Sequence, residues 1–440
     1  MSKRIGITVV LLLFLFAVSA QKKLNYIEVD KKTFELHEQQ KWNELIEYSA
    51  IARKQGMDFF YLQARTGIAY FKLKKFRIAS DWFLKAWEND QSFEWLQEYL
   101  YFSLIFSGRA TEASKLAAGF TPTLKKKINF QYMKPLRAAL EIGYSFNPDL
   151  EKLTSASHHI QANVGDNYGE AFYLKNYNFE SFDYIHQIAP GVNLNHNFTH
   201  TGVNREEQVY WGSLNSFPIN IHQFQYFLSP HFVLGEKLYV STSVNLAWGN
   251  TNLLIGDYNP NTFYTSNFKY FDYIFSAAIW SHFGNFSPGI EINQANIYDV
   301  NRTKISARVT VYPLSNTKLY FTPRVHFKTD IEGNIGYNAF GILGGVQLGQ
   351  IHFIGHYLNG DMKNFVESAG YVIGNFPGKS SRKYTGSLYF PAGKKYQFVV
   401  RYINQDVIEK YQVYVDAVQS SSIEYKYIKH TLTGGISWIF

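Results

Sequence analysis

The stretch KLYVSTSVNLAW, residues 237–248, decides the fold because its residues alternate between apolar and polar along the chain. One face of this stretch carries Leu238, Val240, Thr242, Val244, Leu246 and Trp248. The other face carries lysine, tyrosine, serine and asparagine. A period of two is the signature of a strand, in which successive side chains point to opposite faces. The stretch therefore predicts a strand with one apolar and one polar face.

The same alternation extends outward from this stretch, from about residue 128 to the end of the chain. It is clear in LRAALEIGYSF (136–146), KLYFTPRVHFK (318–328) and TLTGGISWIF (431–440). A soluble sandwich would alternate too, so the pattern alone leaves both folds open. Strands of about ten residues or more, with aromatic residues crowding their ends, favour a barrel that crosses a membrane.

The predicted connections also alternate in length, as expected for short turns at one end of a barrel and longer loops at the other. The short ones are 234–237, 284–288, 313–318, 348–351 and 391–395. The long ones are 200–214, 249–267, 329–337, 359–382 and 406–423. A sheet in hydrocarbon must close to satisfy its edge groups.

We expect strands to begin near 134, 157, 184, 217, 237, 268, 287, 303, 318, 338, 351, 383, 395 and 425, about fourteen in all. Twelve strands, with extra structure within 150–183, is the alternative. The fold class predicted for the chain is therefore α + β multidomain, with an antiparallel transmembrane β-barrel of 12–14 strands over residues 128–440.

Residues 21–127 form the other predicted domain, because from about 25 to 120 the apolar spacing is near 3.6 and proline is absent. KWNEL (41–45), KFRIA (75–79) and RATEA (109–113) recur every 34 residues, which is typical of tetratricopeptide repeats. The middle copy resembles that family, although Gln63 and Thr66 depart from its pattern. The predicted packing positions are Trp42, Gly67, Tyr70, Phe76, Ala79, Phe83, Ala86 and Ala113. A generic array of helical hairpins is the alternative, and either would bind a partner rather than catalyse.

The first twenty residues predict an export signal, with Lys3 and Arg4 before an apolar run and AVSA as a cleavage site after Ala20. A retained membrane helix is the alternative. The chain has no cysteine, which excludes disulfides, thiolate metal sites, a thiol nucleophile and a lipidated cysteine. Its net charge of +8 is modest for 440 residues, and the charge pattern gives no support for nucleic acid binding.

The terminal strand ending in Trp438 and Phe440 resembles the last segment of bacterial outer-membrane proteins, which the barrel-assembly machinery reads in that group. VYPLSNTKLYFTP (311–323) and NFVESAGYVI (364–373) resemble segments of YaiO-type outer-membrane barrels. The resemblance implies a cell outer-membrane location, with the helical domain in the periplasm and membrane lipid around the barrel. The combination of helices and barrel also resembles exporters of polysaccharide and translocators of surface lipoproteins.

A search for catalytic groups finds none, and no cofactor or metal site is predicted. His352 and His356, like His196 and His200, lie four residues apart, about 13 Å along a strand, which is too far to share one metal ion. Ser157, His158 and His159 lack an assignable acidic partner. The residues expected to line the lumen are Arg137, Glu141, Lys304, Arg308, Arg324, His326 and Arg401. These side chains would either favour anions in an open pore or pair with carboxylates and plug it.

We therefore expect a non-enzymatic barrel in envelope transport or biogenesis, with helices that dock a periplasmic protein or glycan cargo and a barrel that passes or holds it. The alternatives are a structural subunit of a larger complex with a plugged lumen and, third, a barrel enzyme that acts on lipid or glycan.

Overall fold

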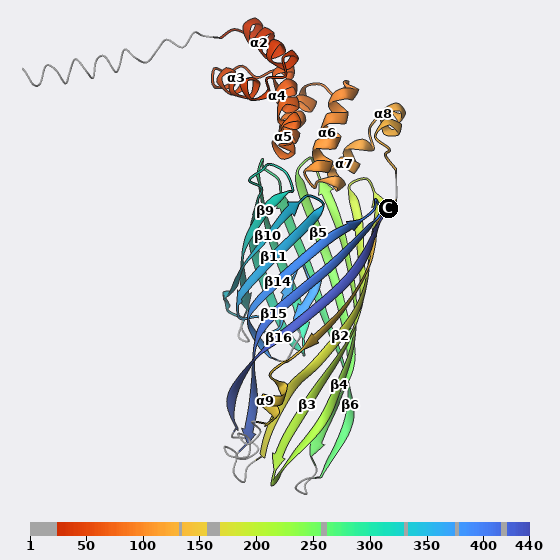
Figure 1. The fold of residues 1–440 in the computed structure, drawn as a ribbon, viewed down its shortest axis with the longest axis vertical. Helices are drawn as coiled ribbons and strands as arrows, with labels where there is room; N and C mark the ends of the chain where they lie inside the picture. The colour runs from red at the N-terminus through yellow and green to blue at the C-terminus, as the bar shows by residue number, and fades with distance from the viewer. Residues whose placement is uncertain are drawn as a thin grey trace, which may run out of the picture. The chain divides into compact units, whose positions relative to one another are not determined.

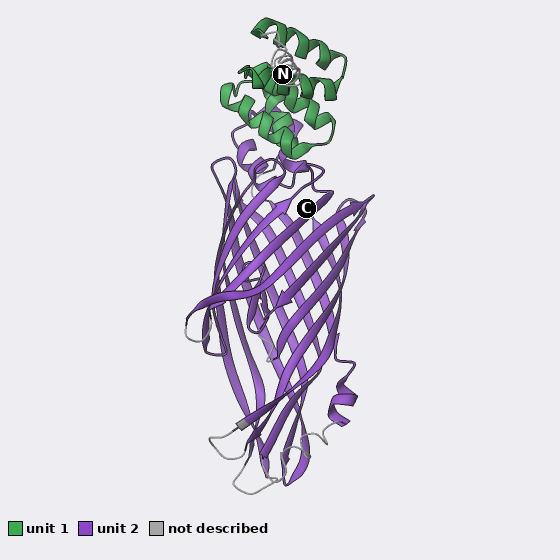
Figure 2. Cartoon of the chain, turned by 90° about the vertical axis from the view of Figure 1, so that its left-hand side faces the viewer, with its two compact units in different colours: residues 1–103 green, residues 104–440 purple. Residues whose placement is uncertain are grey.

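The computed structural model describes residues 24–131, 134–155, 168–256, 262–329, 333–374, 378–414 and 420–440. The proposed signal peptide, residues 1–20, lies outside them. The chain divides into two compact units, residues 1–103 and 104–440 (Figure 2). The helices that precede the first strand are α2 (Tyr26–Glu38), α3 (Trp42–Lys54), α4 (Phe60–Lys72), α5 (Phe76–Asn89), α6 (Glu94–Phe106), α7 (Ala110–Ala117) and α8 (Pro122–Lys127).

The predicted interval of 34 residues recurs in these helix boundaries. Helices α2, α4 and α6 begin at residues 26, 60 and 94, and α3, α5 and α7 begin at 42, 76 and 110. The turn inside each pair contains one residue with a positive φ, at Gln40 (55°), Lys74 (58°) and Gly108 (79°). These left-handed residues end one helix and let the next one begin two residues later. The chain thus repeats a helical hairpin, turn geometry included.

Within the first unit, the predicted packing positions lie between the helices. Ala79, Phe83 and Ala86 on α5 are fully buried. Gly67 on α4 faces the Phe83 ring so closely that a Cβ atom at Gly67 would lie 2.6 Å from Phe83 Cε1. Because only glycine leaves this space, residue 67 sets how close α4 and α5 approach.

The second unit contains a barrel (Figure 1). Its strands are β1 (Pro135–Phe146), β2 (Tyr168–Ala189), β3 (Val192–Trp211), β4 (Ser213–Leu234), β5 (Leu238–Gly256), β6 (Phe263–Ser281), β7 (Phe286–Ile297), β8 (Val300–Val311), β9 (Leu319–Thr329), β10 (Ile335–Leu348), β11 (Ile351–Gly360), β14 (Lys379–Ala392), β15 (Tyr396–Tyr414) and β16 (Ser420–Ile439). A short hairpin, β12 (Phe365–Glu367) and β13 (Val372–Gly374), pairs only with itself.

The fourteen long strands close in the order β1-β16-β15-β14-β11-β10-β9-β8-β7-β6-β5-β4-β3-β2. The last and first strands complete the ring through an antiparallel ladder from Arg137↔Ile439 to Phe146↔His430. This arrangement confirms the predicted fold class, helices followed by a closed antiparallel barrel, and selects fourteen strands over twelve.

Several of the predicted strand and loop boundaries are wrong. The loops expected at 249–267 and 406–423 are mostly strand, since β5 and β6 cover most of the first and β15 and β16 most of the second. Residue 184 lies inside β2 rather than at a strand start, and the loop expected at 200–214 is a tight turn at Gly212 between the long strands β3 and β4. Gly212 has a φ of 74°, which glycine adopts without strain. The strand start predicted near 157 lies outside the described residues. Polar sequences continue as strand here because β3 pairs with β2 on one side and with β4 on the other along nearly its whole length.

The strands differ in length, so part of the wall extends beyond the rest. Strand β1 ends at Phe146, whereas β2 to β6, β15 and β16 have 19 or more residues each. Beyond the end of β1, β2 pairs directly with β15 at Gln412↔Glu170 to Tyr414↔Tyr168. Helix α9 (Leu150–Ser155) packs Leu150 and Leu153 on this junction.

The barrel is apolar outside and polar inside. On β5, Ser241, Ser243 and Asn245 are buried, while Trp248 on the opposite face is exposed. On β1, Leu140 and Ile142 are 57% and 65% exposed. Among the described residues, none of the helices combines the length and apolar character needed to cross a membrane.

Candidate functional site: a hairpin across the barrel lumen

The connection between β11 and β14 folds into the barrel. We call Phe365–Gly374, which comprises β12, β13 and the turn between them, the lumen hairpin. Its turn contains three consecutive residues with positive φ, Ser368 (54°), Ala369 (54°) and Gly370 (90°). Two of them are not glycine, so the turn holds a conformation that side chains disfavour. Such a turn persists because surrounding contacts hold it.

The lumen hairpin spans the lumen from one wall to the other. Tyr371 donates a hydrogen bond to Asp183 on β2 (3.3 Å), and the Phe365 ring contacts His326 on β9 (ring centroids 5.1 Å apart). In the closed order of fourteen strands, β2 and β9 are seven places apart and therefore stand on opposite sides. A segment that touches both must cross the interior.

The turn of the hairpin is held by polar side chains of β3 and β5. Ser243 donates to the carbonyl oxygen of Ala369, and Asn245 Nδ2 donates to that of Gly370 (2.8 Å). Asn197 Nδ2 donates to the Tyr371 hydroxyl (3.1 Å). Hydrogen bonds of this kind contribute about 1 kcal/mol each, so this end of the hairpin is fixed by several modest interactions.

The base of the hairpin combines ionic and apolar contacts. Lys383 on β14 forms an ion pair with Glu367 (2.6 Å), and Lys304 on β8 donates to the carbonyl oxygen of Val366. Val366 packs against Ile274, Ala295 and Ile297, and Phe365 packs with Met362 against Ala339 and Leu358. The hairpin is therefore anchored on many strands without joining any of their ladders.

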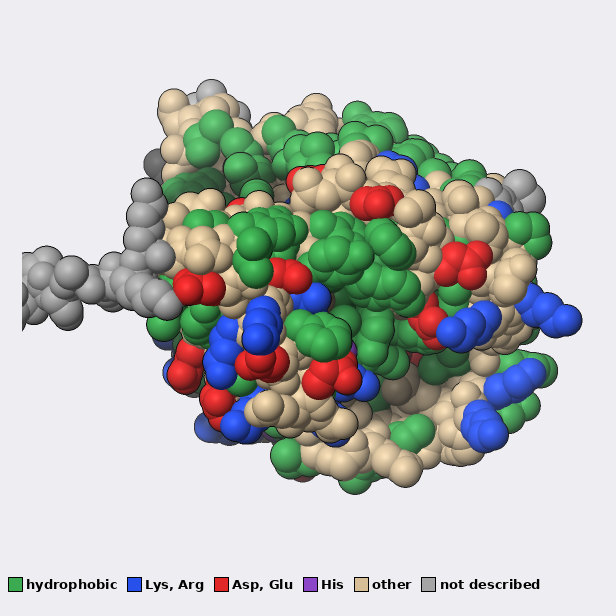
Figure 3. Space-filling view, turned by 90° about the horizontal axis from the view of Figure 1, so that it is seen from above, with side chains coloured by type: hydrophobic (Ala, Val, Ile, Leu, Met, Phe, Trp, Pro, Cys, Tyr) green, Lys and Arg blue, Asp and Glu red, His purple; other side chains and the backbone are tan. Residues whose placement is uncertain are grey.

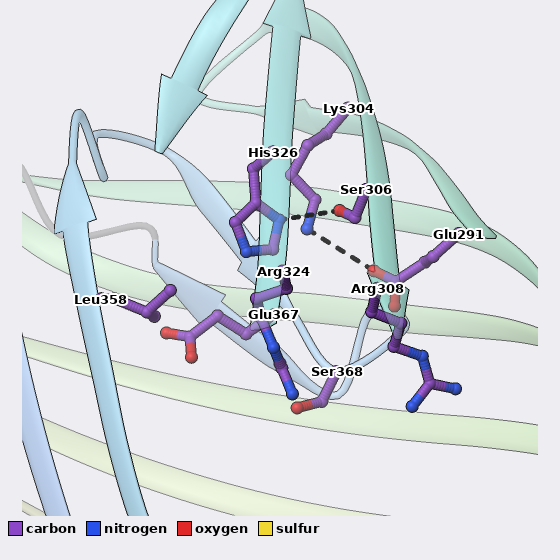
Figure 4. A pocket seen from close by; sticks show the side chains of 9 residues that line it. All are labelled: Glu291, Lys304, Ser306, Arg308, Arg324, His326, Leu358, Glu367 and Ser368. Carbon is purple, nitrogen blue, oxygen red and sulfur yellow. Dashed lines mark hydrogen bonds and ion pairs between the residues drawn. The ribbon is translucent and has the colours of Figure 1, made fainter. Parts of the chain in front are cut away.

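A small cavity lies between this base and the wall (Figure 4). Its lining side chains come from β7, β8, β9, β11 and the hairpin: Glu291, Lys304, Ser306, Arg308, Arg324, His326, Leu358, Glu367 and Ser368. Lys304 pairs with Glu291 (3.5 Å), and His326 Nδ1 shares a hydrogen bond with Ser306 (2.8 Å). The Nε2 atom of His326 is buried and has no hydrogen-bond partner.

The seven residues predicted to line the lumen all alternate with outward apolar residues, but they divide into two groups. Arg137 pairs with Asp183 (2.7 Å), and Arg401 pairs with Glu141 (2.8 Å), away from the cavity. The cavity contains the other four, Lys304, Arg308, Arg324 and His326. The inner wall thus carries arginine–carboxylate ion pairs in one place and a cavity rich in cationic side chains in another.

A second buried polar cluster lies in the extended part of the barrel. Arg205 on β3 forms an ion pair with Glu409 on β15 (2.8 Å), and both side chains are 5% exposed. Tyr425 and Tyr427 on β16 each donate a hydrogen bond of 2.8 Å to Glu409. Strand β3 is thereby joined inside the barrel to β15 and β16, some two hundred residues later in the chain, which stiffens the extension.

Helix α7 docks on the turns at the end of the barrel where the chain terminates. Its Glu112 accepts hydrogen bonds from Arg109 (2.6 Å) and from Tyr239 of β5 (2.7 Å). Burial raises the pKa of the Glu112 carboxyl, although the Arg109 charge acts to lower it. Lys115 donates to the carbonyl oxygens of Val233 and Gly235. The barrel unit therefore includes α7, earlier in the chain than the boundary expected at residue 128.

The histidines considered for catalysis lie apart from one another. His352 and His356 face inward on β11, and their buried Nε2 atoms have no hydrogen-bond partner. His196 shares a hydrogen bond with Tyr226 (2.9 Å), and His200 lies 2.8 Å from Glu180. His158 and His159 lie outside the described residues. Within the described ranges, no group of three or more metal-ligating side chains is found.

The lumen hairpin was not anticipated, because 359–382 looks like one of the long external loops. Its sequence nevertheless contains a signal, since Met362, Phe365 and Val366 are unusual in an exposed loop and are all at most 6% exposed. The segment NFVESAGYVI (364–373), one of the two on which the YaiO-type resemblance rests, covers nearly all of the lumen hairpin.

No family model matches the chain, and neither does any curated protein sequence. Solved structures similar to it include a Pseudomonas aeruginosa FadL homologue (8% identity, TM-score 0.44, 74% of this chain and 94% of that one). They also include a deletion mutant of the monoaromatic hydrocarbon channel TodX (8%, 0.45, 75% and 95%) and the Acinetobacter baumannii outer membrane protein Omp33 (10%, 0.31, 70% and 100%). These scores are too low to support an argument, so the barrel assignment rests on the strand pairing. The YaiO-type and tetratricopeptide assignments stay predictions.

Proposed function

We propose that the protein is a non-enzymatic barrel of the outer membrane whose lumen is closed at rest by the lumen hairpin and conducts when the hairpin leaves. The observation that carries this proposal is that a loop segment crosses a polar lumen without pairing to the wall strands. In a barrel whose lumen is permanently closed, the side chains of the wall strands would be enough to fill the lumen. A separate hairpin can leave without breaking the barrel.

The outer surface of the barrel supports this proposed location. Lipid requires the backbone groups of the sheet to be paired and the outer band to be mainly apolar. The closed ladder and the outward Leu140 and Ile142 support this. Trp438 and Phe440 stack with ring centroids 5.4 Å apart at the end of the terminal strand, where an aromatic girdle would lie. Insertion would require the barrel-assembly machinery.

The conductance of single barrels in planar bilayers tests the closure. Met362 N donates to the carbonyl oxygen of Ser380 (2.9 Å), so the two ends of the loop meet and a short Gly-Ser linker can replace residues 363–377. We expect the wild type to be mostly closed and the linker variant to show steady open current.

A reversible disulfide between the hairpin and the wall provides a second test beside the linker variant. The chain has no cysteine, so Ser243→Cys with Ala369→Cys places the only two thiols at the hairpin turn and the wall. Oxidation should abolish residual openings and reduction should restore them, while either single variant should be insensitive to both treatments. If the linker variant stays non-conducting, the transport role is wrong, and a structural subunit with a permanently filled lumen becomes the better explanation.

For the helical unit we propose that it docks a periplasmic protein or glycan. It exposes several large apolar side chains, among them Phe34, Ile51, Tyr61 and Trp95. Viewed from above, apolar side chains gather in a group with charged ones beside them (Figure 3). Deleting residues 24–92 retains the contacts of α7 with the barrel, so the barrel should still assemble while partner recovery in a pull-down is lost. Unchanged recovery would reject the docking role.

A further inference from the structure

A row of six residues crosses five neighbouring strand pairs inside the barrel, at the level of the cavity. The register pairs Trp280 with Gly289, Gly289 with Arg308, Arg308 with Arg324, Arg324 with Gly341, and Gly341 with Leu358. All six belong to the inward faces of β6 to β11, since their sequence neighbours are the outward residues. The centre of the row is a pair of arginines directly opposite each other.

The glycines on either side make room for the arginines. A Cβ atom at Gly289 would lie 3.2 Å from Arg308 Nε, and one at Gly341 would lie 3.3 Å from Arg324 Cγ. The Arg308 guanidinium also lies over the Trp280 ring, 5.7 Å from its centroid. The wall therefore packs against the Arg308 guanidinium and against the aliphatic stem of Arg324.

The two arginines carry charge that the neighbouring carboxylates do not neutralise. The cavity contains Glu291 and Glu367, and each forms an ion pair with a lysine, Lys304 and Lys383 respectively. Among the described residues, Arg308 and Arg324 form no ion pair within 4 Å, and the Nε atom of Arg324 is buried without a hydrogen-bond partner. Like charges directly opposite each other destabilise a sheet, so this pair has a cost that an anion would remove.

We propose that Arg308 and Arg324 bind a small oxyanion, a phosphate or carboxylate group, in the lumen beside the base of the hairpin. Two guanidinium forks present parallel N–H donors that match the oxygens of such a group. His326 lines the same cavity, and the Ser368 side chain lies beside Arg324 at its rim (Figure 4). The site belongs to the closed state of the lumen, so it does not depend on the proposed opening of the barrel.

Thermal unfolding of the full chain in detergent, followed by heat-modifiable gel migration, tests the site. Inorganic phosphate, added at constant ionic strength against chloride, should raise the unfolding midpoint of the wild type in a saturable way. Glucuronate in a parallel series tests the carboxylate. Isothermal titration with the same two anions measures the dissociation constant, which we expect to rise about tenfold or more in Arg324→Gln and in Arg308→Gln.

The variants carry a second, independent signature. In chloride alone, Arg308→Gln should unfold at a higher temperature than the wild type, because the opposed charges are gone. Arg401→Gln is the matched control, since this lumen arginine has its own carboxylate, Glu141. Its midpoint should fall while its affinity for phosphate stays that of the wild type. Arg324→Lys keeps the charge and the fold, and it should retain a weakened site.

Three results would overturn the proposal. The first is a wild type whose midpoint and heat of binding respond to phosphate and glucuronate no more than to chloride. The second is an equal loss of affinity in Arg401→Gln, which would indicate a general charge effect. The third is unchanged affinity in both arginine variants. None of these results bears on whether replacing the hairpin opens the barrel, so the two proposals fail separately.

Discussion

The helical unit and the barrel are built on opposite rules. The helices bury Leu45, Leu62 and Phe83 and expose charge, as a water-soluble unit does. The barrel buries Asn245, Lys304 and Glu409 and exposes many leucines and isoleucines on its outer face. Apolar burial stabilises the first, whereas the second depends on a closed ladder and on polar contacts inside it. The difference shows that exposure of a side chain has no meaning until the solvent around it is known.

The largest expected effect concerns the polar core of the barrel, where Glu409 is buried. Glu409→Ala should destabilise the barrel by roughly 3–5 kcal/mol, because it leaves the buried Arg205 without its carboxylate and two tyrosines without their acceptor. Urea unfolding in lipid vesicles measures it. Lys410→Ala is the matched control, since this neighbour on the same strand pairs with Glu424 on the exposed face and should cost less than about 1 kcal/mol. Equal costs would contradict a polar core.

The corresponding test of the apolar core of the helical unit is Phe83→Ala. This ring is fully buried against Gly67 and stacks on Tyr99 with centroids 5.6 Å apart. Its loss should destabilise the helical unit by about 3–5 kcal/mol and leave the barrel unaffected. Far-UV circular dichroism of the full chain in urea measures the stability of the helical unit, and heat-modifiable gel migration measures the stability of the barrel. A parallel loss of barrel stability would mean that the two units do not unfold separately.

The smallest expected effect is the loss of stability when one exposed apolar residue in each unit is replaced by arginine. Leu140→Arg should cost about 2–4 kcal/mol if the residue faces the centre of the bilayer. Ile51→Arg on α3, where the side chain is 45% exposed, should change the stability by no more than about 0.5 kcal/mol. Both are measured by urea titration in vesicles. A harmless Leu140→Arg would place β1 outside lipid.

How far the sequence predicts this molecule differs between its parts. Twelve of the strand starts, from β1 and from β4 onward, lie within about five residues of the expected positions. The helix starts follow the 34-residue interval. The strand start expected at 184 and the loop expected at 200–214 are wrong because polar residues such as Asn178 and Asn204 continue strands that are maintained by their pairing rather than by their pattern.

The residues of the cavity can be predicted from the sequence only in part. Parity along the strands places Lys304, Arg308, Arg324 and His326 on the inner face. It gives no register between strands, however, and therefore cannot show that the two arginines lie opposite each other. Nor could alternation show that residues 365–374 fold inward, since that depends on contacts with strands more than a hundred residues away, such as that of Ser243 with Ala369.

The ladder between β1 and β16 has a consequence for assembly. It joins Arg137 to Ile439, so the first and last strands of the ring must find each other across some three hundred residues of intervening chain. Contacts between such distant segments form slowly, and an unclosed sheet presents two unpaired edges to any other chain. The protein therefore remains vulnerable to aggregation until its final strand is synthesised, and its survival before that moment depends on something that holds those edges apart.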